Sequence, residues 1–166
     1  MSTDLIMGLG DDAQSNNYDL KFPVGIPGGG SADNIALRAD QSFDPPGRSI
    51  STYDIVYRGL KVTKVGNAEE TEKVFSIDVR VDGKWEVYDD LERWIKLVFD
   101  PETHIGMDQA QVSTTMQVVS YGRNDEVAKT ITFKGVILKG LKVGSFDQNG
   151  TDPIRLTLDF AFANFF

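Results

Sequence analysis

The chain has 166 residues, enough for one domain with a continuous hydrophobic core and too few for two ordinary domains. Its 17 lysines and arginines against 25 aspartates and glutamates give a net charge of −8, which argues against tight binding to nucleic acid, because that affinity rests on cations that neutralise phosphates. The absence of cysteine excludes disulfides and thiolate metal sites, and the absence of a signal-peptide pattern or a long apolar run predicts a soluble cytosolic product without a membrane span.

The N-terminal quarter predicts an arm followed by a strand pair. Residues 1–17 are polar with one short apolar patch, which is typical of an arm that orders only on a neighbour. Tyr18–Val24 and Asn34–Asp40 are predicted strands, joined by the glycine-rich hairpin loop Pro27–Ser31. A phosphate-binding glycine loop is the alternative, but no Lys-Ser/Thr pair follows it and no helix is expected there.

A stiff connector precedes two longer predicted strands. Tandem prolines restrict Phe43-Asp44-Pro45-Pro46-Gly47-Arg48, because each proline holds its φ and cannot donate to a ladder. The strands are expected over Ser51–Val65 and Val74–Asp82, joined by a turn at 66–71.

The faces of these two strands differ. Phe75, Ile77 and Val79 alternate with polar residues and are core candidates. In the earlier strand both faces carry apolar residues, which predicts that both meet protein and that the hairpin reaches a neighbouring subunit. One face carries Tyr53, Ile55 and Tyr57, and the other Val56, Leu60 and Val62.

A change to helical periodicity predicts one amphipathic helix of about 12 to 15 residues between Asp82-Gly83 and Asp100-Pro101. Its apolar stripe is Trp85, Tyr88, Leu91, Trp94, Ile95 and Val98, and Leu91, Trp94 and Ile95 are core candidates. The stripe indicates that the helix closes the core. A platform for stacking a ligand on Trp85 and Trp94 is the alternative.

Three further strands are expected after a loop at 100–110: Gln111–Tyr121, Val127–Leu138 and Ile154–Asn164. The last alternates strictly, with Leu156, Leu158 and Phe160 toward a core and Thr157, Asp159 and Ala161 on the other face.

The residues that could carry catalysis do not form a recognisable site. His104 has no partner for a zinc site or a triad, and the adjacent acids at 11–12, 69–70 and 89–90 are predicted to be solvated charges. The segment 147–152 is similar to a calcium loop but lacks the closing glutamate, so a turn is expected. We therefore expect no enzymatic activity, no metal and no cofactor.

The order and spacing of these elements resemble those of a known family. A strand pair, a proline-containing connector, a long hairpin, one helix and three closing strands resemble the tail tube protein of contractile-tailed (myovirus-type) bacteriophages. Lys129–Val136 is similar to that family's charged, β-branched strand ending in Lys-Gly-hydrophobic, and Asp152–Phe166 to its C-terminal strand. The likeness extends from Tyr18 to Phe166.

The resemblance implies a mainly β protomer with one helix, an antiparallel barrel or sandwich over 18–166, six of which form a ring with an inner β-barrel. Rings would stack into a hollow tube in a virion, assembled in the bacterial cytoplasm and conducting DNA without specific binding. The implied partners are other copies of the chain, the tail sheath protein, the tape measure protein, and the baseplate and tail terminator proteins. Inter-subunit candidates are Phe43, Pro45, Pro46, Arg48, Tyr53, Ile55 and Tyr57, and lumen candidates are Thr157, Asp159 and Ala161.

Two alternatives stay open beside the phage tube. One is the tube subunit of a phage-like contractile injection system, of the tailocin or secretion type. The other is a monomeric β-barrel with an internal site for a small apolar ligand, which predicts a cavity.

Overall fold

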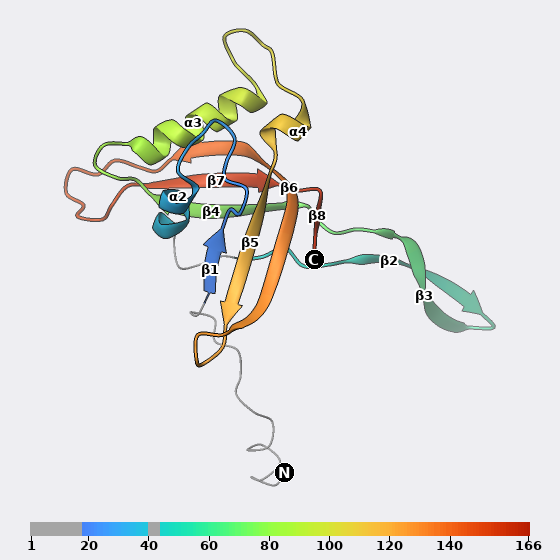
Figure 1. The fold of residues 1–166 in the computed structure, drawn as a ribbon. Helices are drawn as coiled ribbons and strands as arrows, with labels where there is room; N and C mark the ends of the chain where they lie inside the picture. The colour runs from blue at the N-terminus through green and yellow to red at the C-terminus, as the bar shows by residue number, and fades with distance from the viewer. Residues whose placement is uncertain (1–17, 40–43) are drawn as a thin grey trace.

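The structure is a computed structural model that describes residues 18–39 and 44–166, so the predicted arm 1–17 and Phe43 lie outside the described residues. Eight strands and three helices occur in the described ranges (Figure 1). They are β1 (Tyr18–Lys21), α2 (Ala32–Arg38), β2 (Ile50–Tyr57), β3 (Leu60–Glu69), β4 (Val74–Arg80), α3 (Glu86–Val98), α4 (Gln109–Val112), β5 (Thr114–Tyr121), β6 (Val127–Val143), β7 (Arg155–Ala161) and β8 (Asn164–Phe165).

The body is an antiparallel sheet in the order β1-β5-β6-β7-β4, with β8 paired to β6. The 17-residue β6 joins its two halves, because its first part pairs with β5 and its second part with β7. Gly135, at φ 68°, lies near this change of partner, in the irregularity between the Met116–Phe133 and Thr114–Val136 pairs, where positive φ lets the strand change direction. β5 therefore crosses β4 and β7 in Figure 1, and the folded sheet encloses the core. The expected mainly β, antiparallel protomer flanked by a helix is confirmed.

Helix α3 closes the core, as its apolar stripe predicts. It begins after Asp82, whose carboxylate accepts a hydrogen bond from the Val87 backbone amide at 3.3 Å, and ends before Pro101. Leu91 and Trp94 are fully buried, and the indole Nε1 of Trp94 donates to the Val112 carbonyl at 2.8 Å. The core candidates Phe75, Ile77, Val79, Leu91, Trp94, Leu156, Leu158 and Phe160 are buried, whereas Ile95 is half-buried.

The predicted strand over Asn34–Asp40 is wrong, because α2 occupies Ala32–Arg38. Ser31 caps this helix: its hydroxyl accepts a hydrogen bond from the Asn34 backbone amide at 3.3 Å. The Pro27–Ser31 segment is thus the approach to a helix, and β1 pairs with β5 instead. The expectation of a single helix is also wrong, since α2 and the short α4 accompany α3.

The predicted single strand over Ser51–Val65 is wrong as well. The chain reverses at Arg58-Gly59, with φ values of 49° and 82°, so β2 and β3 form a hairpin. Positive φ at both central residues is the two-residue turn whose twist matches paired strands. The turn predicted at 66–71 is largely the end of β3 and its exit.

Candidate assembly surface

The β2–β3 hairpin is set apart from the body. Its strands pair with each other and with no other strand of the described chain, and in Figure 1 the hairpin projects beyond the end of β4. A two-stranded hairpin is at best marginally stable alone in water. It therefore needs a surface that covers it.

One face of the hairpin is almost entirely apolar. Register places Ile55 opposite Val62 and Tyr57 opposite Leu60, and paired residues of antiparallel strands share a face. The apolar hairpin face consists of Tyr53, Ile55, Tyr57, Leu60 and Val62, whose exposed fractions run from 41% to 66%. The sequence-based prediction that Leu60 and Val62 lie on the other face from Ile55 is wrong, because the turn at Arg58-Gly59 brings them to the same face.

The other face is mostly polar. The Asp54 carboxylate accepts a hydrogen bond from the Thr63 hydroxyl at 2.7 Å and lies 3.0 Å from the Lys61 ammonium. These two donors, Thr63 first, lower the pKa of Asp54 below its ordinary value. Val56 is an exposed apolar residue on this face. The hairpin is thus amphipathic, with one face suited to protein contact and one to solvent.

The base of the hairpin is tied to the body through the connector. The Glu70 amide donates to the Ser49 carbonyl at 2.8 Å, and the Ser49 amide to the Thr71 hydroxyl at 3.0 Å. The Arg48 guanidinium lies 4.4 Å from the centre of the Phe165 ring and donates to the Phe165 carbonyl. Arg48, an inter-subunit candidate, therefore has an intrachain role, and the hairpin starts from a defined point.

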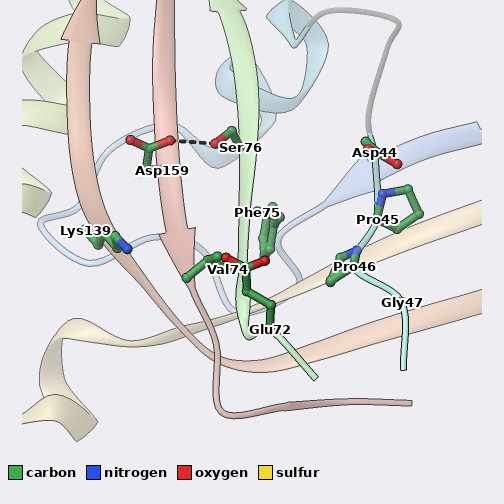
Figure 2. Close-up of a pocket in the computed structure, with 10 residues that line it drawn as sticks. All are labelled: Asp44, Pro45, Pro46, Gly47, Glu72, Val74, Phe75, Ser76, Lys139 and Asp159. Atoms are coloured by element: carbon green, nitrogen blue, oxygen red, sulfur yellow. Dashed lines mark hydrogen bonds between the residues drawn. The ribbon is translucent and has the colours of Figure 1, made fainter. Parts of the chain in front are cut away.

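A surface hollow of about 790 Å³ lies between the connector and the edge of the sheet. Figure 2 shows Asp44, Pro45 and Pro46 across from β4, with Lys139 and Asp159 beyond it. The hollow thus brings two inter-subunit candidates near one lumen candidate. Its other lining residues are Gly47, Glu72, Val74, Phe75 and Ser76. Among residues 18–39 and 44–166, no three potential metal ligands lie together, and the charged residues that line the hollow are Asp44, Glu72, Lys139 and Asp159.

The lumen candidates Thr157, Asp159 and Ala161 lie on the outer face of β7, opposite the buried Leu156, Leu158 and Phe160. Thr157 donates to the Asp78 carboxylate at 3.0 Å, and the Ser76 hydroxyl donates to that of Asp159 at 2.5 Å. The cations on the same face are Arg80, Arg155 and Lys142. This face therefore carries cations beside the lumen candidates.

The remaining candidates for catalysis or metal binding within the described residues are exposed, with the exception of Asp90. His104 and the turn 147–152 are exposed, and Asp147 accepts hydrogen bonds from the Asn149 and Gly150 amides. Asp89 is exposed, but the prediction that Asp90 is solvated is wrong. Asp90 is 9% exposed, accepts a hydrogen bond from the Ser31 amide at 3.2 Å and pairs with Arg93.

No protein-family model matches the chain, and no curated protein matches it by sequence. Among solved structures, a chain from the anti-feeding prophage (AFP) baseplate superposes with a TM-score of 0.63 at 9% identity, over 95% of each chain. A chain from the sheath-tube complex of an extracellular contractile injection system, PVC, in its extended state, superposes with a TM-score of 0.61 at 15% identity, over 100% of this chain and 97% of that one. A chain from the AFP tube-terminating cap gives 0.63 at 11% identity, over 95% and 91%. The chain therefore has the fold found in these contractile assemblies along nearly its whole length.

Proposed function

We propose that this protein is a tube subunit of a contractile tail or injection apparatus, which associates with copies of itself into hexameric rings that stack into a hollow tube. The observation that carries the proposal is the apolar hairpin face, which projects from the body with its side chains 41% to 66% exposed. An exposed apolar surface on an unsupported two-stranded sheet favours an assembled protein. The full-length superposition on chains of contractile assemblies supports the same conclusion.

Two kinds of apparatus use such a tube, and different observations favour each. The order of strands, the segment Lys129–Val136 and the C-terminal strand resemble the phage tail tube protein, which favours a virion and the passage of DNA. The superposed structures belong to an anti-feeding prophage and an extracellular injection system, which favours an injection machine. In both, the proposed partners are a sheath, a terminator and a baseplate. A tape measure protein is added in the phage.

The alternative of a small-ligand barrel receives no support from the core. The cavity beneath α2, lined by Leu20, Phe22, Ile35 and neighbouring apolar residues, measures about 10 Å³. That is about the space of one water molecule. The core of Phe75, Phe133, Phe160 and Trp94 packs ring against ring, with centroid distances of 5.2 to 5.8 Å.

Negative-stain electron microscopy of the purified full chain, over a range of protein concentration, tests the proposal. We expect rings or hollow tubes. A strictly monomeric protein at high concentration, with no particles of either kind, would rule the proposal out. Purification of the intact apparatus would distinguish the two candidates by whether it carries a DNA-filled head.

A further inference from the structure

A second aromatic surface lies where α3 begins, formed by two half-buried rings and one exposed ring. The Trp85 and Phe146 rings stack at 6.3 Å with an angle of 13° between their planes, and the Tyr88 ring packs edge-on against Trp85 at 5.6 Å. Phe146 belongs to the connection between β6 and β7 and is 72% exposed. We refer to Trp85, Tyr88 and Phe146 as the aromatic end cluster.

This cluster and the hairpin lie at opposite ends of the body. Strand β4 leaves the hairpin at Val74 and runs to Arg80, after which a short turn reaches Trp85. Figure 1 shows the connection between β6 and β7 and the start of α3 at one end of the molecule, and the hairpin at the other. A copy displaced along the strands would therefore bring its hairpin toward this end.

The backbone of Trp85 is in a conformation that a tryptophan rarely adopts. Its φ and ψ are 59° and 25°, in the left-handed region, and its side chain makes no capping hydrogen bond to α3. Asparagine or glycine would suit this position better, because non-glycine residues other than asparagine and aspartate rarely take positive φ. The indole is only half-buried, so core packing does not account for it. Strained residues of this kind concentrate at binding sites.

We propose that the aromatic end cluster of one protomer receives the apolar hairpin face of a second copy. The inference rests on the proposed function and specifies its axial contact. A contact between two different surfaces at opposite ends of the protomer is heterologous. When the displacement from one copy to the next does not return to the first copy, repeated contacts of this kind build an open filament. Tyr53 and Tyr57 on one side and Trp85 on the other belong to the residue types that dominate binding energy in interfaces.

Other exposed apolar residues fit this contact less well. Phe99, Ile105 and Met107, at the end of α3 and in the loop after it, are 48% to 69% exposed. That loop lies at the C-terminal end of α3, opposite the end where Trp85 lies (Figure 1). It therefore serves as the competing acceptor in the experiment.

Crosslinking can test the contact directly, because the chain contains no cysteine. The test protein carries Lys64→Cys and Ser145→Cys. Lys64 pairs with Tyr53, so one thiol borders the apolar hairpin face, and the other lies beside Phe146. After assembly and treatment with a short bismaleimide, a denaturing gel should show a ladder of multimers. Each single-cysteine variant alone should remain monomeric on that gel, and a mixture of the two should stop at dimers.

Two matched pairs locate the contact. Val65→Cys with Ser145→Cys moves the hairpin thiol by one residue to the other face, and Lys64→Cys with Thr103→Cys tests the loop after α3. We expect both yields to be several-fold lower. An equal or higher yield from either matched pair would overturn the proposal.

A substitution provides an independent readout. Phe146→Asp should remove tubes and leave rings or monomers, with an unchanged melting temperature, whereas Val127→Asp, at an exposed apolar residue outside both surfaces, should leave tubes intact. Two results would refute this contact while the tube function stands, provided that the wild type forms tubes. One is the absence of the crosslinked ladder, and the other is normal tubes from Phe146→Asp. A wild-type protein that forms neither rings nor tubes would refute the function itself.

Discussion

The β4–β7 pair and the β2–β3 hairpin have the same local sequence pattern, but the apolar residues of the first are buried and those of the second are exposed. Both are antiparallel pairs with rows of alternating apolar residues. In the body, Ile77 and Leu158 are 3% and 1% exposed, whereas on the hairpin Ile55 and Tyr57 are 41% and 66% exposed. The difference is what covers them: helices α2 and α3 and the folded sheet in one case, and no other strand of the described chain in the other. Stability should therefore reside in the body and association in the hairpin.

The largest expected effect is in the body, at Trp94. Trp94→Ala should lower the free energy of unfolding by about 3 to 5 kcal/mol, because it empties a large, fully buried position. Urea denaturation measures this. Trp94→Phe keeps most of the volume but leaves the Val112 carbonyl without its indole donor, and should cost about 1 to 3 kcal/mol. An unchanged midpoint for Trp94→Ala would contradict the assignment of stability to this core.

A smaller effect is expected at Asp90, which ties α3 to the approach to α2. Asp90→Ala should cost about 1 to 3 kcal/mol, because it leaves the Ser31 amide and the Arg93 guanidinium without their carboxylate. Asp89→Ala is the matched control on the neighbouring, exposed residue and should stay within about 0.5 kcal/mol of the wild type. Equal effects of the two substitutions, measured by urea denaturation, would show that the contacts of Asp90 with Ser31 and Arg93 do not contribute to stability.

In the hairpin the effect on stability should nearly vanish while the effect on assembly is large. Ile55→Asp should change the free energy of unfolding by no more than about 0.5 kcal/mol, since the side chain is exposed in the protomer. It should abolish long tubes in electron micrographs, because it places a charge in the apolar hairpin face. Val56→Asp, on the opposite face, is the control and should still form tubes. Normal tubes from Ile55→Asp would contradict the division between body and hairpin.

The smallest effect concerns the polar face of the hairpin and acid pH. The Thr63 hydroxyl and then Lys61 lower the pKa of Asp54. The ionised carboxylate therefore contributes to the stability of the folded hairpin above the ordinary pKa of 3.8, and this contribution is lost as pH falls through the lower pKa of the folded state. A carboxyl titration followed by NMR should therefore have its midpoint below 3.8. Thr63→Val and Lys61→Met should each move that midpoint upward. A wild-type midpoint at or above 3.8 would show that these contacts do not form in solution.

Much of the body could be predicted from the sequence, because its elements combine a strong period with a long run. The helix over Glu86–Val98 has a continuous apolar stripe bounded by turn residues, and β4 and β7 alternate strictly. Short elements were harder to predict. Helix α2 has only seven residues, and the glycine-rich segment before it favoured a hairpin loop. Ser31, which caps the helix, was the residue in the sequence that indicated a helix start. Arg58-Gly59 was likewise a visible turn pair inside a run of β-branched and aromatic residues.

By itself the sequence determined the fold class, which is mainly β, together with the principal helix and the apolar rows that fill the core. These follow from local periodicity, which each segment carries within itself. Only the tertiary structure decided which apolar rows are covered, since Ile77 and Ile55 lie in similar local patterns and differ in their neighbours. It also decided that Asp90 is buried and that Tyr57 and Leu60 share a face. Both depend on the path of the chain through α2 and the turn at Arg58-Gly59, and no single segment contains that path.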